Sequence, residues 1–163
     1  MLKKLYALML ISFIIFYIGI FLAPYTAYLG EHSEIFKLIS FYIYTAYSLI
    51  CHQLPKRSYF IFGYKMAVCA RCFGIYTGYL VGMLIYPFIK KLNDFKIPNK
   101  WYLIFALTPM AIDGTTQLIG LRESFNELRF ITGFIAGFVS VFYIMPIFLN
   151  IVYKYFKKIY KRS

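Results

Sequence analysis

Apolar residues along the chain fall into long runs separated by short polar segments, and four of these runs predict membrane-spanning helices. They cover residues 5–22, 66–89, 101–119 and 130–153. Each is close to the roughly 20 apolar residues that cross the hydrocarbon core of a bilayer. A fifth run, 35–50, is shorter and contains Lys37 and Thr45, so it predicts a short span, a re-entrant helix or an interfacial helix. The predicted fold is an all-α bundle of four transmembrane helices, or five if residues 35–50 also cross.

The composition narrows the class of protein further. Of the 163 residues, 61% are hydrophobic and 22% aromatic, which predicts one integral membrane domain over residues 1–163 rather than a soluble multidomain protein. The run at 5–22 follows Lys3 and Lys4 as a secretory signal would. It is longer than a usual signal core and further spans follow it, so we interpret it as a helix of the mature protein. We attribute the net charge of +12 to membrane topology and predict no nucleic-acid partner.

The basic residues form two groups that predict the orientation in the membrane. One group has eleven basic residues and one acidic residue, a net charge of +10: Lys3, Lys4, Lys90, Lys91, Asp94, Lys96, Lys100, Lys154, Lys157, Lys158, Lys161 and Arg162. The other basic residues number seven and are accompanied by five acidic ones, a net charge of +2. Cytoplasmic loops are enriched in Lys and Arg. With four spans, both termini are therefore cytoplasmic and the second group lies at the extracytoplasmic face of the cell membrane. A full crossing by residues 35–50 would move the N-terminus outside.

Glycines recur at intervals of four in two of the predicted spans. They are Gly74, Gly78 and Gly82 in one span, and Gly133 and Gly137 in another. Small residues on one helical face let two backbones approach closely in lipid. We interpret these glycines as a packing seam between helices rather than as ligand-binding positions.

The three cysteines of the chain lie in one stretch with a histidine. Cys51-His52 precedes Cys69-Ala-Arg-Cys72, and a C-x-x-C pair with an upstream Cys-His pair suits a four-ligand zinc site. Adjacent Cys51 and His52 are an awkward pair for one ion, which leaves open whether both bind it. The alternatives are thiol–disulfide exchange, with the positive charge of Arg71 lowering a thiol pKa, a structural disulfide, or buried cysteines without chemistry.

Asp113 is an ionisable residue inside a predicted span, with Gln117 four residues later on the same helical face. Such residues are costly in a membrane and usually face a partner or a polar cavity. We predict that Asp113 is a catalytic acid or base. The structural alternative is a buried ion pair with Arg71, Arg122 or Arg129 that fixes the packing of helices.

Further polar residues precede the last predicted span. Ser124-Phe-Asn-Glu127 fits a capping box and predicts that a helix begins near Phe125. Two guanidinium groups near a helix N-terminus suit a phosphate or carboxylate, so we expect an anionic lipid or a lipid-linked phosphate as the partner. The predicted substrate-binding residues are Arg57, Arg71, Gln117, Arg122, Ser124, Asn126 and Arg129. Alternatively, Arg122 and Arg129 are interfacial anchors paired with Glu123 and Glu127.

These motifs together resemble a known family. The ordered set is Cys51-His-Gln53, Arg57-Ser58, Cys69-Ala-Arg-Cys72, Gly74-Ile-Tyr76-x-Gly78, Asp113-Gly114-x-x-Gln117 and Arg122-x-Ser124-x-Asn126-x-x-Arg129-x-x-Thr132-Gly133. It is similar to a family of small prokaryotic membrane proteins labelled domain of unknown function 2085. The resemblance covers residues 51–133. It implies a membrane protein and supports the choice of residues, but it implies no activity.

Three functional hypotheses remain open at this point. The first is a membrane-embedded enzyme in which the Cys and His residues hold zinc, the arginines bind an anionic lipid-linked substrate and Asp113 transfers a proton. The second is a transporter or lipid-handling protein that uses Asp113 and the arginines as a substrate or proton site. The third is a membrane thiol–disulfide oxidoreductase. The state of the three thiols distinguishes among them.

Overall fold

The computed structural model describes residues 2–160 of the chain. Within them five α-helices form: α1 (Leu2–Leu29), α2 (Glu34–Ser48), α3 (Ala70–Ile89), α4 (Lys100–Leu118) and α5 (Asn126–Tyr160). A short 3-10 helix, η1 (Pro55–Arg57), and two paired strands, β1 (Phe60–Ile61) and β2 (Tyr64–Lys65), lie between α2 and α3. The predicted all-α class is confirmed. Lys161 and Arg162 of the predicted cytoplasmic group lie outside the described residues.

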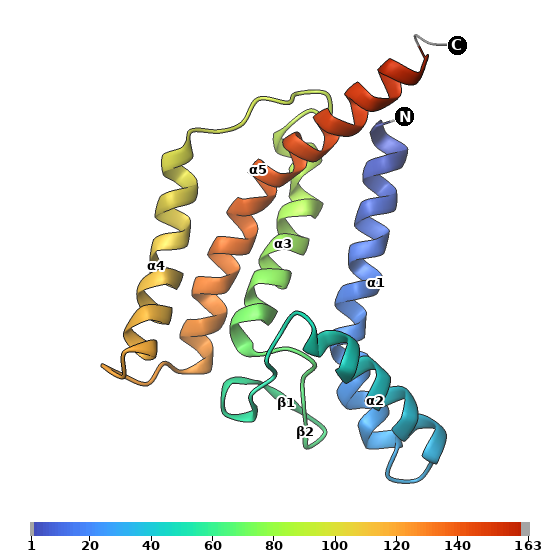
Figure 1. The fold of residues 1–163 in the computed structure, drawn as a ribbon, viewed down its shortest axis with the longest axis vertical. Coiled ribbons are helices and arrows are strands. Elements are labelled where there is room, and N and C mark those ends of the chain that lie inside the picture. The colour runs from blue at the N-terminus through green and yellow to red at the C-terminus, as the bar shows by residue number, and fades with distance from the viewer. Residues whose placement is uncertain (1, 161–163) are drawn as a thin grey trace.

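The helices α1, α3, α4 and α5 run lengthwise, so the molecule has two ends where the connecting segments lie (Figure 1). The first turn of α1, the loop of residues 90–99 and the C-terminal part of α5 lie at one end, which we call the terminal end. Residues 49–69 and the turn of residues 119–125 lie at the opposite end, which we call the motif end. The loop of residues 90–99 therefore shares an end with both termini of the described chain, as the charge pattern predicted.

Three of the helices are long and apolar enough to cross a membrane. These are α1, α3 and α5. The helix α4 runs beside α5 and has 19 residues, but Asp113 and Gln117 make its second half more polar. The four-span topology stays a prediction, with α4 as the fourth span.

The helix α2 folds back along the second half of α1. The hydroxyl of Ser40 donates to the carbonyl of Ala23 at 3.2 Å, and the hydroxyl of Tyr47 donates to the carbonyl of Phe16. With 15 residues, α2 is about 22 Å long at 1.5 Å per residue, less than the roughly 30 Å of a hydrocarbon core. The helix thus ends beside the middle of α1, a geometry that suits a re-entrant or interfacial helix better than a full span.

The predicted glycine seam is confirmed between α3 and α5. A Cβ atom added at Gly74 would overlap the backbone of Phe130, and one added at Gly78 would overlap the backbone of Phe134. From the other side, Gly137 meets the backbone of Ile75 in the same way. The two helices can approach this closely only because these positions lack side chains.

The hairpin β1–β2 was not predicted from the sequence. Its two central residues, Phe62 and Gly63, have φ values of 54° and 81°, the left-handed values typical of a tight two-residue hairpin turn. The ring of Phe62 stacks on Tyr28 with the ring centroids 5.3 Å apart. This contact holds the hairpin against the end of α1.

Candidate functional site

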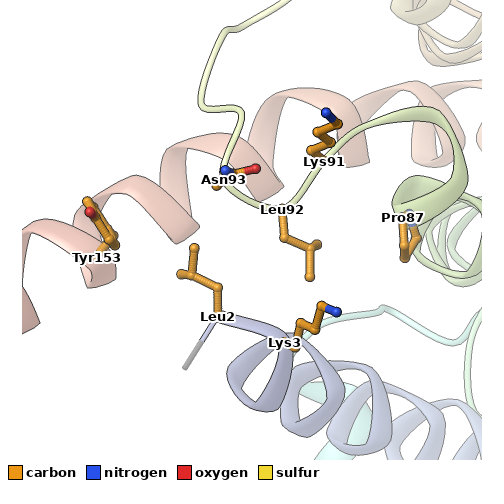
Figure 2. A pocket seen from close by; sticks show the side chains of 7 residues that line it. All are labelled: Leu2, Lys3, Pro87, Lys91, Leu92, Asn93 and Tyr153. Atoms are coloured by element: carbon orange, nitrogen blue, oxygen red, sulfur yellow. The ribbon is translucent and has the colours of Figure 1, made fainter.

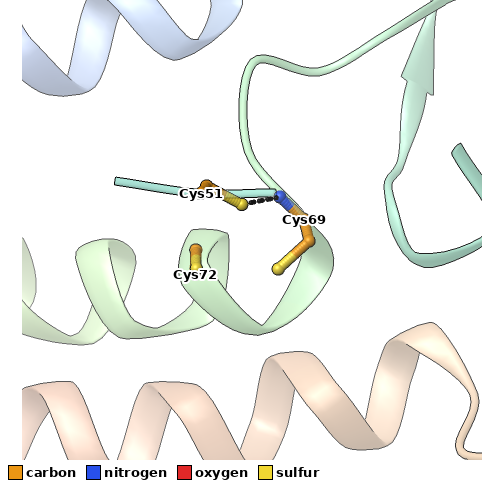
Figure 3. A group of neighbouring side chains, drawn as sticks. All are labelled: Cys51, Cys69 and Cys72. Atoms are coloured by element: carbon orange, nitrogen blue, oxygen red, sulfur yellow. Dashed lines mark hydrogen bonds between the residues drawn. The ribbon is translucent and has the colours of Figure 1, made fainter. Parts of the chain in front are cut away.

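The three cysteines meet at the motif end although they come from separate segments. Cys51 follows α2, Cys69 immediately precedes α3, and Cys72 lies in the first turn of α3. Their sulfur atoms all lie within 4.8 Å of one another, between the segment that carries Cys51 and the start of α3 (Figure 3). All three cysteines are free. The C-x-x-C spacing places two sulfurs on one helical turn, and the chain after α2 brings the third sulfur to them.

Hydrogen bonding makes the three thiols unequal. The pKa of the Cys51 thiol is lowered far below its ordinary value, because hydrogen bonds from Cys69 and Cys72 stabilise its thiolate. The backbone N–H of Cys69 also donates to the Cys51 sulfur at 3.1 Å. The same arrangement raises the pKa of the Cys69 thiol, chiefly through its hydrogen bond to Cys51. A cation bound between the sulfurs would stabilise more than one thiolate at this place.

The surroundings of the sulfurs are mostly apolar. Cys51 is 5% exposed and Cys69 is 3% exposed, and both belong to a core cluster with Ile20, Tyr47 and Val68. A set of three shielded sulfur ligands suits zinc or another thiophilic ion. This donor set fits the predicted cofactor.

His52 does not join the other three predicted ligands. Its Nδ1 atom lies 3.8 Å from the Cys51 sulfur, but the side chain is exposed and lies outside the group of ligand atoms within 4.8 Å of one another. Three protein ligands leave one position of a tetrahedral site for water or substrate. Of the four predicted ligands, the structure therefore brings together only the three cysteines.

Three residues that the sequence analysis did not assign to the site hold the Cys51 segment in place. The side chain of Gln53 donates to the carbonyl of Tyr44 at 2.8 Å, and the Lys65 ammonium donates to the carbonyl of Gln53 at 3.0 Å. The hydroxyl of Tyr44 donates in turn to the carbonyl of Lys65. Gln53 has a φ of 48°, a left-handed value that these bonds stabilise. The sequence motif contained Gln53, but its bonding partners are distant along the chain.

Asp113, on α4, pairs with Arg71, which lies between Cys69 and Cys72 in the sequence. Asp113 is 1% exposed and accepts hydrogen bonds from Arg71 and from Arg122 at 2.7 Å. The Ser124 hydroxyl lies near enough to this carboxylate to interact with it electrostatically. The structure thus contains the buried ion pair that the sequence offered as the structural alternative, with two arginines in place of one.

The end of α4 explains how Arg122 reaches Asp113. The N–H of Leu121 donates to the carbonyl of Thr116 at 3.0 Å, and the N–H of Gly120 donates to the carbonyl of Gln117 at 3.2 Å. These two bonds, with a φ of 74° at Gly120, form the Schellman motif that often ends a helix. The chain turns back, so the Nε atom of Arg122 also donates to the Thr116 hydroxyl at 3.2 Å.

Arg129 is a buried cation that forms no ion pair in the described chain, although the charge of Asp113 acts on it from a greater distance. Arg129 is 5% exposed, and its Nη1 donates to Asn126 Oδ1 at 2.7 Å. Its Nε atom has no hydrogen-bond partner, and no carboxylate pairs with it within residues 2–160. The positive charges of Arg57 and Arg71 add to its electrostatic surroundings. A buried charge of this kind is costly unless an anion neutralises it.

The predicted residues therefore form two adjoining groups that meet at the start of α3. Arg71, Arg122 and Ser124 surround Asp113, while Asn126 and Arg129 lie at the start of α5. The Asn126 amide also approaches the carbonyl of Ser58 at 3.4 Å, which brings the segment of Arg57 to the same place. Gln117 is half-buried one turn after Asp113. The cysteine group adjoins both, because Cys69 and Cys72 flank Arg71 and Arg129 interacts electrostatically with Cys69.

Comparison with known proteins places the chain among relatives. The family described as "Predicted membrane protein (DUF2085)" matches residues 51–143. The chain belongs to this family. It is 77% identical over 155 residues to an uncharacterized protein of Methanocaldococcus jannaschii, an alignment that covers 95% of this chain and 99% of the relative. It is 42% identical over 94 residues to an uncharacterized protein of Methanothermobacter thermautotrophicus, covering 54% of this chain and 78% of the relative. No solved structure matches.

The matched region contains the candidate site in full. It begins at Cys51, the first predicted metal ligand, and extends through α3, α4 and much of α5. The helices α1 and α2 lie outside it. The family match confirms the resemblance drawn from the motifs.

Proposed function

We propose that this multi-pass membrane protein is an enzyme that binds zinc and acts on an anionic, lipid-linked substrate at the motif end. The observation that carries the proposal is the meeting of three sulfur atoms within 4.8 Å from two separate segments. A zinc ion with three protein ligands supplies a Lewis acid with an open coordination position. The shielded, apolar surroundings of the sulfurs suit that chemistry, because electrostatic interactions are stronger away from water.

In this proposal the arginines bind the anionic group of the substrate. Arg129 is buried and has no carboxylate partner in the described chain, so the anionic group of a substrate would neutralise it. Arg57 and Asn126 lie beside it and add a charge and an amide donor. An arginine guanidinium binds planar phosphate or carboxylate oxygens through two parallel hydrogen bonds. The exposed hydrophobic residues at this end, Leu121 and Phe125 among them, would let the apolar part of a lipid reach the site.

In this proposal the first role of Asp113 is to position Arg71 and Arg122 by ion pairing. Both of its oxygens accept hydrogen bonds from guanidinium groups, so proton transfer to the carboxylate would compete with these contacts. Its role as general acid or base stays a prediction. Substrate binding near Arg71 or Arg122 is the event that would open such a contact.

The proposal can be tested through the spectrum of a cobalt-loaded protein. Cobalt(II) replacing zinc at the three cysteines is expected to give a thiolate charge-transfer band. Titration with dioctanoyl phosphatidic acid is then expected to change the ligand-field bands in a saturable way. Arg129→Gln should weaken this titration about tenfold by removing the charge-assisted contact. Lys56→Gln, which removes a neighbouring exposed charge, should leave it unchanged. A titration that is the same in Arg129→Gln and in the wild type would contradict the proposal.

A second candidate function is thiol–disulfide exchange, which the lowered pKa of Cys51 favours because the thiolate is the nucleophile. The Cys51 thiolate would attack a disulfide in a partner protein and release one partner thiolate. The thiolate of Cys69 or Cys72 would then displace the second partner sulfur, leaving a disulfide here and a reduced partner. Purified protein with two thiols oxidised and no metal would favour this function over the first.

The proposed orientation places the terminal end in the cytoplasm and the motif end outside it. The support is the charge distribution. The described residues of the basic group lie at the terminal end, with Asp94 as the one acidic residue among them, and basic loops stay in the cytoplasm. Four spans, α1, α3, α4 and α5, satisfy this arrangement without a crossing by α2.

A further inference from the structure

A cavity at the terminal end lies far from the motif end and belongs to none of the chemistry described above. Its volume is about 830 Å³, within the range of roughly 300–1,000 Å³ typical of ligand sites. It opens between the first turn of α1, the end of α3, the loop that follows α3, and α5 (Figure 2). Four separate segments thus contribute to one concave surface.

Two lysines in the cavity form no ion pair with an acidic residue within residues 2–160. Lys3 comes from α1 and Lys91 from the loop after α3. Asp94 is the one acidic residue near them in sequence, and it pairs with Lys90 at 3.9 Å while accepting from the backbone N–H of Lys96 at 3.0 Å. No ion pair forms at Lys3 or Lys91 in the part of the chain that the structure describes. An anionic ligand could therefore supply the counter-charge for these two ammonium groups, which none of residues 2–160 supplies.

The remaining lining is mostly apolar. Leu2, Pro87, Leu92 and Tyr153 form it, together with the polar Asn93. The side chains of Leu2 and Leu92 project into the gap between α1 and the loop (Figure 2). A free inorganic anion would leave this apolar surface uncovered, whereas a ligand with both an anionic head and a hydrocarbon chain would cover it. Tyr153 is a residue type enriched at the membrane–water interface.

We propose that this cavity binds an anionic phospholipid, with its headgroup phosphate between Lys3 and Lys91 and an acyl chain against Leu2 and Leu92. The charge and the apolar lining together select this ligand, because basic pockets between helices on the cytoplasmic side attract anionic headgroups. The lipid would connect α1 to the loop after α3 and to α5. The inference is independent of the proposed metal and substrate chemistry.

Native mass spectrometry of the full-length protein in detergent tests the proposal. Titration with phosphatidylglycerol and, separately, with phosphatidylcholine is expected to show preferential binding of the anionic lipid. Each lysine contributes about fivefold to the preference at this cavity, so Lys3→Gln combined with Lys91→Gln should remove the tightly bound phosphatidylglycerol of this site and leave any binding at the motif end in place. Lys3→Arg with Lys91→Arg keeps the charge and should keep the preference. Lys154→Gln with Lys157→Gln removes the same charge from the same end outside the cavity and should change the affinity less than about twofold.

Two further measurements separate a lipid from a free anion. Leu92→Ser should weaken phosphatidylglycerol binding without any change of charge, because it removes apolar surface that contacts the acyl chain. Inorganic phosphate at millimolar concentration should not displace the bound lipid. Equal losses in the two glutamine double variants, equal binding of both lipids, or displacement by inorganic phosphate would each overturn the proposal.

Discussion

Asp113 is the residue on which the polar part of the motif end depends. It is 1% exposed and is paired with Arg71 and Arg122. Removing one partner of a buried ion pair leaves the other charge uncompensated in a medium that solvates it poorly. Here the loss of one carboxylate would leave two guanidinium groups close together.

Asp113→Asn is therefore expected to lower the free energy of unfolding by about 3 kcal/mol, since it breaks a buried ion pair. Because Arg122 is partly exposed, the expected loss of stability is at the lower end of the range for broken buried ion pairs. Thermal unfolding in detergent measures it. The control is Asp94→Asn, whose carboxylate is 41% exposed and should cost less than about 1 kcal/mol. Similar losses in the two variants would show that Asp113 does not stabilise the fold through its arginines.

For individual residues, the sequence predicted which types of interaction occur better than it predicted which residues take part in them. The C-x-x-C spacing and the early Cys51 were enough to predict a cluster, because one helical turn separates Cys69 from Cys72. The pairing of Asp113 with arginines followed from the cost of a charge in a span. The position of His52 near Cys51 but outside the group of three sulfurs could not be predicted. Nor could the lack of an ion pair at Arg129 within residues 2–160. Both depend on distances between segments far apart in sequence.

The contact between α3 and α5 is the tightest helix pair in the described chain and depends on glycine at several turns. The backbone of each helix occupies the space where the other would carry a Cβ atom. Both helices also carry residues of the motif end, Cys72 and Arg71 on α3 and Arg129 on α5. The seam thus fixes the distance between the cysteine group and the arginines.

Gly78→Ala is expected to destabilise the protein by about 2 kcal/mol, because the new Cβ atom would overlap the backbone of Phe134 and force the helices apart. Gly114→Ala serves as the matched control. Its nearest neighbour would be the Arg71 guanidinium at 3.4 Å, an ordinary contact. Thermal unfolding of both variants in the same detergent makes the comparison. Equal stability of the two would contradict the role assigned to the seam.

The helices themselves followed from their apolar runs, but several boundaries did not. The run at 66–89 is apolar throughout, whereas α3 begins at Ala70, because Met66, Ala67 and Val68 are buried in an irregular segment. Hydropathy alone does not distinguish a buried extended segment from the start of a helix. The helix α5 begins at Asn126, next to the predicted Phe125. The Ser124 hydroxyl donates to the carbonyl of Phe125 at 3.5 Å and forms no capping bond within the described residues.

Basic and acidic residues are distributed unequally between the two ends of the molecule. The basic terminal end carries the lysine-lined cavity, and the motif end carries the cysteines, the arginines and most of the acidic residues. The helices α3, α4 and α5 run between the two ends, and α2 folds back beside α1. The predicted topology depends on this separation rather than on any single contact.

Fusion of green fluorescent protein to the C-terminus tests the orientation, because the reporter becomes fluorescent only when it folds in the bacterial cytoplasm. The four-span arrangement predicts a fluorescent fusion. The matched fusion with alkaline phosphatase, which is active only outside the cytoplasm, should be inactive. An active phosphatase with a dark fluorescent protein would place the terminal end outside and reverse the proposed orientation.

The most direct test of the central claim is elemental analysis with thiol counting on detergent-purified protein, wild type beside Cys69→Ser. Three sulfurs within 4.8 Å predict about one zinc per chain in the wild type, because three thiolates and one further ligand complete a tetrahedral site. Removing one of the three ligands should abolish or strongly reduce the zinc content. Zinc-free wild-type protein with two of its three thiols oxidised would contradict the metal site and leave thiol–disulfide exchange as the function that the cysteine cluster supports.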